Sequence, residues 1–215
     1  MHTDPLTEDW KSRWQEGRIG WHEAGGNLAL RKFWPTTGIG NRVLVPLCGK
    51  SPDLLWLAQH GYDVTGVELS EIAVRAFFDD SGLEFETGEA DGLLIFECPS
   101  PRITLVCGDY FNFSRKQFDA LYDRASLIAL PRKNRPEYIR HTKSLLKSNA
   151  TQLLITLEYD QSRVDGPPYS VLADEVADYW GNIQRVSEYN ALDSTPPKFR
   201  EAGLTEVIEA VWLKN

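Results

Sequence analysis

Short apolar strands alternate with capped helices from residue 42 onward, and this alternation restricts the possible folds more than any other feature. The runs Arg42–Pro46 and Asp63–Leu69 are rich in β-branched residues and are typical of buried strands. A helical pattern follows each run, and the second helix has Ser70 as a suitable start and Gly82 as a suitable end. This order predicts an α/β fold with a mostly parallel sheet covered by helices on both faces.

Further strand patterns continue this order toward the end of the chain. Apolar runs at 103–107, 118–122 and 152–159 are typical of core strands, and the stretch 84–101 is compatible with a hairpin. The late segments 183–192 and 205–213 have strand character but no full crossover helix between them. We therefore expect a Rossmann-like, three-layer sheet that ends in an antiparallel pair, as in nucleotide-cofactor folds.

Length and charge indicate one globular domain without a nucleic-acid partner. The chain has 215 residues, and at about 150 residues per domain we expect a single domain over 1–215. Helical patterns and three of the seven tryptophans, which lie within the first 21 positions, precede the first strand. We therefore expect an N-terminal helical lid over 1–40 and an α/β core over 41–215. The net charge of −8 argues against a nucleic-acid surface, which needs a basic patch.

Targeting signals and metal-ligand patterns are not evident in the sequence. No apolar run approaches the roughly 20 residues of a membrane span, and the acidic start MHTDPLTEDW differs from a signal peptide. We therefore expect a cytoplasmic protein without a membrane partner. The four histidines and three cysteines form no metal-binding motif, so we expect no metal, and the cysteines are interpreted as inert buried thiols.

The first strand–helix turn, Pro46–Ser51, identifies the cofactor class by exclusion. A dinucleotide fingerprint needs three glycines, and this turn has only Gly49. A phosphate loop ending in Gly49-Lys50-Ser51 would need its first glycine at Leu44, inside the strand. The sequence thus disfavours a nicotinamide or flavin enzyme and a phosphate loop.

Glu68 ends the second strand, 21 residues after Leu47. An acid at this distance can accept hydrogen bonds from a ribose diol, although an exposed carboxylate at a strand end is the plain alternative. A ribose-binding acid without a pyrophosphate turn indicates an adenosine cofactor that lacks phosphates. S-adenosyl-L-methionine is the obvious candidate.

Four segments of the sequence resemble a known family of enzymes that use this cofactor. The segment VLVPLCGKSPDLLWLAQHGYDVTGVELSEIAVRAFF closely resembles the first two βα units of the thiopurine S-methyltransferase family. Three further segments resemble other parts of the same family: TEDWKSRWQEGRIGWH at the N-terminus, FDALYDRASLIAL in the middle and GPPYSV after the fifth core strand. The resemblance implies a bacterial-type class I methyltransferase with seven strands, the last one antiparallel. It also implies transfer of a methyl group from S-adenosylmethionine to the sulfur of aromatic or heterocyclic thiols by a monomer.

The resemblance also implies site residues. The expected cofactor contacts are Trp10, Leu47, Glu68 and Arg124, with Asp109 and Tyr110 at the adenine. The expected contacts to the methyl acceptor are Trp21, which stands where the family usually has Phe, together with Trp14 and Arg124. Plain alternatives stay open: the tryptophans could be core aromatics of the lid, and Arg124 could be an ordinary ion-paired arginine that Asp123 orients.

We expect no catalytic general base. A thiol with a pKa of about 8.5 is partly ionised at neutral pH, and the sequence offers no His–acid dyad at the site. Positioning alone can supply roughly 7–11 kcal/mol. The rival hypotheses are methylation of sulfide, selenium or tellurium species, as in detoxification of tellurite and selenium, and a non-catalytic S-adenosylmethionine-binding module.

Overall fold

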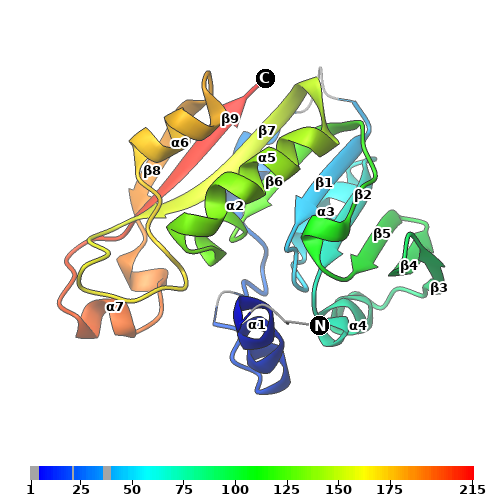
Figure 1. Ribbon diagram of the computed structural model, residues 1–215, viewed down its shortest axis with the longest axis horizontal. Helices are drawn as coiled ribbons and strands as arrows, with labels where there is room; N and C mark the ends of the chain where they lie inside the picture. The colour runs from blue at the N-terminus through cyan, green and yellow to red at the C-terminus, as the bar shows by residue number, and fades with distance from the viewer. Residues whose placement is uncertain (1–4, 21, 36–39) are drawn as a thin grey trace. The chain divides into compact units, whose positions relative to one another are not determined.

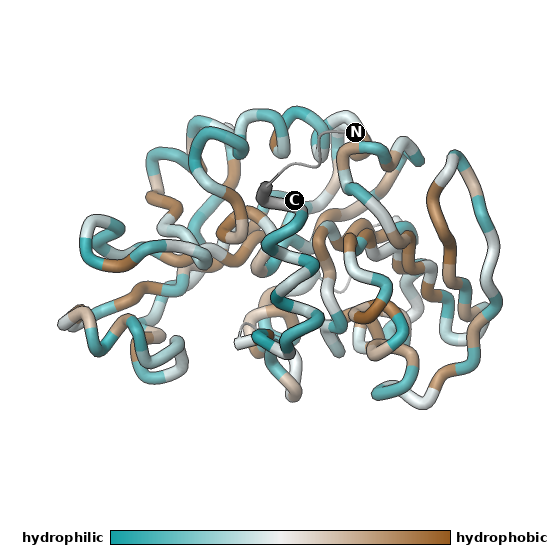
Figure 2. Tube along the Cα trace, turned by 60° about the horizontal axis from the view of Figure 1, so that its bottom comes forward, coloured by the Kyte–Doolittle hydropathy of each residue, from teal (hydrophilic) through white to brown (hydrophobic). Residues whose placement is uncertain are grey.

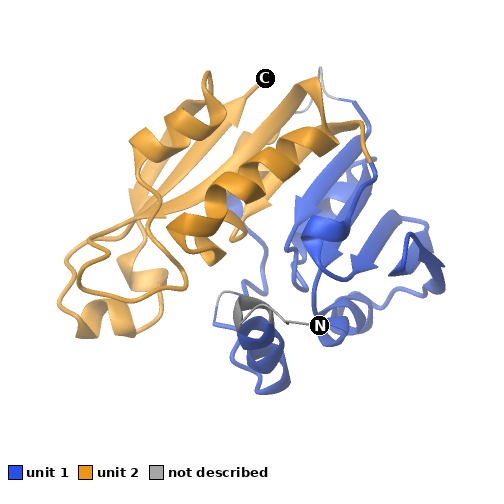
Figure 3. Cartoon of the chain, viewed as in Figure 1, with its two compact units in different colours: residues 1–28, 40–115 blue, residues 29–39, 116–215 orange. Residues whose placement is uncertain are grey.

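The computed structural model describes residues 5–20, 22–35 and 40–215 of the chain (Figure 1). These residues divide into two units, shown in different colours in Figure 3. Unit 1 comprises residues within 1–28 and 40–115, and unit 2 comprises residues within 29–39 and 116–215. The expected lid of residues 1–40 therefore contributes to both units, and its function as a lid stays a prediction, as does the single domain over 1–215.

Unit 1 contains the first two strand–helix repeats and a hairpin. Its strands have the order β3-β4-β5-β2-β1, in which β5, β2 and β1 are parallel and β3 and β4 are antiparallel. Its elements are α1 (Pro5–Gln15), β1 (Arg42–Pro46), α3 (Asp53–Gln59), β2 (Asp63–Glu68), α4 (Glu71–Ser81), β3 (Glu86–Ala90), β4 (Leu93–Pro99), β5 (Arg102–Cys107) and the 3-10 turn η1 (Tyr110–Asn112).

Unit 2 contains one parallel strand pair and the antiparallel end of the chain. Its strands have the order β6-β7-β9-β8, in which β6 and β7 are parallel and β9 is antiparallel to both neighbours. Its elements are α2 (Leu28–Phe33, from residue 29 on), β6 (Phe118–Arg124), η2 (Leu127–Ala129), η3 (Arg132–Asn134), α5 (Arg135–Leu145), β7 (Leu146–Glu158), α6 (Ala173–Trp180), β8 (Gln184–Asn190), η4 (Leu192–Ser194), α7 (Lys198–Glu201) and β9 (Ile208–Lys214).

The expected α/β class and the parallel core strands are confirmed, but the described residues form nine strands rather than seven. The two additional strands, β3 and β4, form the hairpin in the stretch 84–101. This stretch has a weak strand pattern because all five residues of β3 are exposed and carry no apolar alternation. The expected terminal antiparallel pair is present as β8 and β9.

Helix α4 shows how the local sequence determines an element of this fold. The Ser70 side chain caps the helix by accepting from the N–H of Ala73 at 3.4 Å, and Gly82 ends it with a left-handed φ of 62°. Its apolar face, which includes Phe77 and Phe78, is buried. In Figure 2, hydrophobic stretches in brown alternate with hydrophilic stretches in teal along the chain.

Within the described part of the chain, no helix combines the length and apolar character needed to cross a membrane.

Candidate functional site

The turn after β1 has an unusual backbone that directs an N–H group toward β2. Leu47 and Gly49 both have left-handed φ angles, 44° and 54°. This conformation is unfavourable for leucine, so the surrounding contacts must hold it. The N–H of Cys48 donates to the carbonyl of Val67 at 3.1 Å, and the N–H of Gly49 donates to Glu68 Oε2 at 2.8 Å. The turn is therefore attached to the end of β2.

Glu68 is the buried carboxylate at this junction, with 6% of its surface exposed. Its Oε1 accepts from the N–H of Ser70 at 2.8 Å. Burial raises the pKa of the Glu68 carboxyl, although the N–H groups of Ser70, Gly49 and Leu69 stabilise its charged form and partly oppose the rise. A carboxylate has about four acceptor positions, so Glu68 retains the capacity to accept from a diol.

The loop after β5 joins the same strand end. The N–H of Gly108 donates to the Glu68 carbonyl at 2.9 Å, and the exposed Asp109 caps η1 by accepting from the N–H of Phe111 at 3.0 Å. Tyr110 is buried, whereas Phe111 remains partly exposed beside it. Unit 1 thus brings together Leu47, Glu68, Asp109 and Tyr110 at the carboxyl ends of three parallel strands, where ligands bind in open α/β sheets.

The two tryptophans of α1 have different environments. Trp14 is buried, and its ring atom Cζ2 lies 3.3 Å from the position that a Cβ on Gly49 would take. Trp10 is half-buried, with the Arg13 guanidinium 5.4 Å from its ring centre. Trp14 therefore packs against the turn after β1, and its predicted contact with the methyl acceptor stays a prediction. Trp21 lies outside the described residues.

Arg124 belongs to unit 2, where it is the last residue of β6 and is half-buried. The next residue, Ala125, has a left-handed φ of 67°, which is strained for a residue other than glycine. Asp123 holds the turn that follows: it accepts from Tyr138 Oη at 2.8 Å and from the N–H of Leu127 at 3.2 Å. Burial raises the pKa of the Asp123 carboxyl to about 6.

The loop 160–171 follows β7 and contains the GPPYSV segment. Its Tyr169 ring covers Gly166, because a Cβ on Gly166 would lie 2.2 Å from the nearest ring carbon. The N–H of Tyr169 donates to the carbonyl of Ile128 at 2.6 Å, which joins this loop to the segment after β6. The GPPYSV motif marks this segment in the sequence, but it does not reveal that Tyr169 contacts Gly166 and Ile128.

Burial lowers the reactivity of the Cys48 and Cys107 thiols. Cys48 and Cys98 are buried as predicted, whereas Cys107 is only half-buried. Burial raises the pKa of the Cys48 thiol well above its usual value and that of Cys107 to about 11, and the Glu68 carboxylate adds to both shifts. The thiolate is the nucleophile in cysteine chemistry, so these groups are poor nucleophiles at neutral pH. The described residues also contain no cluster of three or more His, Cys, Asp or Glu suited to a metal ion.

Comparison with known proteins identifies relatives over nearly the whole chain. The family described as Thiopurine S-methyltransferase (TPMT) matches residues 6–215. The thiopurine S-methyltransferase of Pseudomonas syringae pv. tomato is 40% identical, covering 99% of this chain and 97% of that protein. That of Bordetella petrii is 43% identical, covering 95% of this chain and 96% of that protein.

A solved structure has the same fold at low sequence identity. The 1,6-didemethyltoxoflavin-N1-methyltransferase of Burkholderia thailandensis, solved with 1,6-didemethyltoxoflavin and S-adenosylhomocysteine, superimposes with a TM-score of 0.62 at 18% identity. The similarity covers 100% of this chain and 92% of that one. At this identity the similarity shows the fold alone, that of a class I methyltransferase.

Proposed function

The chain belongs to the thiopurine S-methyltransferase family and, from this premise, we propose that it methylates the sulfur of aromatic or heterocyclic thiols. It is a methyltransferase that uses S-adenosyl-L-methionine, as this family does. The observation that carries the proposal is the Glu68 carboxylate, buried at the end of β2 and bonded to the Gly49 N–H of the turn after β1.

The residues of unit 1 suit an adenosine that carries no phosphates. The turn after β1 offers one N–H to a carboxylate of the protein itself, whereas a phosphate site would present several free N–H groups to the ligand. Glu68 binds the ribose hydroxyls in our proposal, and Asp109 and Tyr110 hold the adenine. Leu47 and Trp10 complete the cofactor contacts.

Arg124 completes the proposed set, since its charge suits a carboxylate or an electron-rich methyl acceptor. Its place at the end of a buried strand, before the strained Ala125 and next to Asp123, which accepts from Tyr138, supports a functional position. The proposal assigns it to the methionine carboxylate or to the methyl acceptor. Trp14 and Trp21 remain the proposed aromatic contacts of the methyl acceptor, which is a small molecule.

The chemistry needs positioning more than proton transfer. S-adenosylmethionine supplies, when bound, a methyl group already activated on a sulfonium. The thiol loses its proton to solvent before it binds. The protein then excludes water and orients the thiolate sulfur in line with the methyl group, so that the new S–C bond forms as the sulfonium S–C bond breaks and S-adenosylhomocysteine leaves. Aromatic side chains near a sulfonium contribute about 0.5–2 kcal/mol through cation–π attraction. We therefore assign no general base.

A comparison of methyl acceptors tests the proposal. The purified protein is incubated with methyl-labelled S-adenosylmethionine and, separately, an aryl thiol, a heterocyclic thiol, sulfide, selenite and tellurite. We expect the highest kcat/KM with the aromatic or heterocyclic thiols. Turnover only with sulfide, selenite or tellurite would show that one of these species, and not a thiol, is the methyl acceptor. Binding of S-adenosylmethionine without methylation of any acceptor would indicate a non-catalytic module.

A further inference from the structure

Arg135, the first residue of α5, is the largest fully buried side chain of the described residues. A cation at this position is unfavourable for the helix, because the helix N-terminus carries partial positive charge. Burial of a guanidinium adds a desolvation cost. The preference of the helix therefore does not explain an arginine at this position, so the groups that the guanidinium contacts must explain it.

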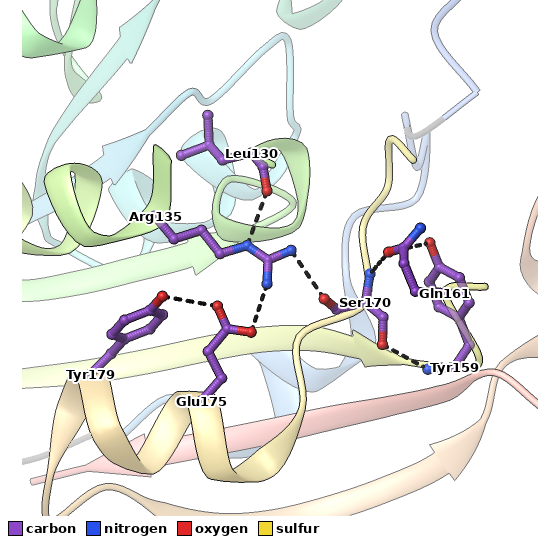
Figure 4. Close-up of polar contacts among 7 residues, drawn as sticks. All are labelled: Leu130, Arg135, Tyr159, Gln161, Ser170, Glu175 and Tyr179. Carbon is purple, nitrogen blue, oxygen red and sulfur yellow. Dashed lines mark hydrogen bonds and ion pairs between the residues drawn. The ribbon is translucent and has the colours of Figure 1, made fainter. Parts of the chain in front are cut away.

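The guanidinium makes three directed hydrogen bonds to three different segments (Figure 4). Its Nε donates to the carbonyl of Leu130 at 3.0 Å, and its Nη2 donates to the carbonyl of Ser170 at 3.0 Å. Its Nη1 donates to Glu175 Oε2 on α6 at 2.9 Å. Arg135 thus connects the segment after β6, the loop after β7 and helix α6.

Glu175 balances the charge and is itself fixed. Its carboxylate lies in the first turn of α6, where the helix favours an acid, and its Oε1 accepts from Tyr179 Oη at 2.9 Å. The pair is almost fully buried, with 2% of the Arg135 and 9% of the Glu175 side chain exposed. A buried ion pair adds little net stability, and its best-supported use is to select one arrangement of the chain.

Ser170 connects Arg135 to further hydrogen bonds within the loop 160–171. Its N–H donates to Gln161 Oε1 at 2.7 Å, and its Oγ accepts from the N–H of Tyr159 at 3.0 Å. Tyr159 Oη donates to the carbonyl of Pro168 at 2.6 Å, and Gln161 Nε2 donates to the carbonyl of Val164 at 2.6 Å. Figure 4 shows the guanidinium and these side chains as one chain of contacts.

We propose that Arg135 is a positioning residue for the methyl acceptor, holding loop 160–171 against the segment that follows Arg124. Loops at the carboxyl ends of parallel strands carry the ligand contacts of α/β proteins, and β6 and β7 are parallel neighbours. The loop presents the half-buried Tyr169 ring, which suits an aromatic thiol. The inference rests on the proposed function and adds a residue that acts through the loop without touching substrate.

The substitution Arg135→Lys isolates this role. Lysine keeps a cation beside Glu175, so the buried carboxylate is not left alone, but one ammonium cannot reproduce the planar fork toward three separate oxygens. We expect the KM for an aryl thiol to rise about tenfold, because the variant loses roughly one hydrogen bond to a charged group. The Kd of S-adenosylmethionine should stay within twofold, and amide hydrogen exchange in 160–171 should accelerate.

The matched control is Arg185→Lys, an arginine of the same unit that pairs with Glu158 and Glu188 on the sheet rather than with the loop. It should change neither the KM nor exchange in 160–171. An unchanged KM in Arg135→Lys, or a loss confined to cofactor affinity or to thermal stability, would overturn the inference. A wild-type protein that methylates no thiol would instead defeat the proposed function, and the two failures are thus distinguishable.

Discussion

The carboxylate of Glu68 accepts the backbone N–H of Gly49 at 2.8 Å, which ties the end of β2 to the turn after β1. One side chain thereby performs two tasks, because it shapes the turn and presents the acceptor that we assign to the ribose. Loss of its charge should therefore affect cofactor binding more than a change at a neighbouring surface acid.

Glu68→Gln should weaken binding of S-adenosylmethionine roughly 10- to 100-fold, as expected for loss of hydrogen bonds to a charged group. Titration calorimetry measures the effect, and thermal unfolding reports any loss of the turn. The control is Glu71→Gln, an exposed acid of α4 that pairs with Arg75. An unchanged Kd in Glu68→Gln would remove Glu68 from the cofactor site.

Gly49→Ala should lower the free energy of unfolding by about 1–2 kcal/mol, because alanine is strained at a φ of 54°. Its Cβ would also lie 3.3 Å from the Trp14 ring, so the tryptophan must shift. Denaturant unfolding measures the first effect and tryptophan fluorescence the second. Gly88→Ala has open space around its Cβ and no left-handed φ, so it should neither lower the free energy of unfolding nor shift a tryptophan.

Asp123→Asn should alter the pH dependence of stability between about pH 4 and pH 6. The folded protein protonates Asp123 near pH 6, whereas an unfolded aspartate protonates near pH 3.9. In this interval the folded state binds more protons than the unfolded state, so the contribution of Asp123 to stability falls as the pH rises, by up to about 1.4 kcal/mol per unit.

Urea unfolding of the wild type and of Asp123→Asn at each pH isolates this contribution as a difference. The wild type should lose stability relative to the variant from pH 4 to pH 6, and the difference should then level off. Asp80→Asn, on the exposed end of α4, is the control for the loss of one carboxylate. A pH-independent difference for Asp123→Asn would show that the carboxyl is not perturbed.

Gly166→Ala should displace the Tyr169 ring, since the new Cβ would lie 2.2 Å from a ring carbon. Overpacking of this kind costs about 1–3 kcal/mol. We expect the KM for an aryl thiol to rise up to about tenfold while the Kd of S-adenosylmethionine is retained. Steady-state kinetics and calorimetry separate the two quantities, with Gly88→Ala again as the control. Equal losses in both would place this loop outside the site of the methyl acceptor.

Local signals account for the parts of the fold that the sequence predicts well. Helix α4 begins after Ser70 and ends before Gly82, as expected. Caps and apolar faces are determined by neighbours within a few residues, so they can be read directly. The exposed strand β3 lacks such signals, and only its pairing with β4 makes it a strand.

The candidate site also combines positions that the sequence predicts with contacts that only the structure reveals. The position of Glu68 follows from its place at the end of a strand, but its bond to the Gly49 N–H depends on the left-handed turn that only the structure reveals. The contacts of Arg135 join the start of α5 to three other segments, and these segments meet only after folding. Tertiary contacts of this kind leave no periodic pattern in a sequence.

The hairpin strand β3 pairs only with β4 among the described strands, and its five residues are exposed. A strand with one unpaired side is a template on which other chains can add and aggregate. Glu86 and Glu89 place negative charge along this strand, and such charges oppose addition of a second copy. The negative charge of β3 thus opposes self-association of the protein through this edge of the hairpin.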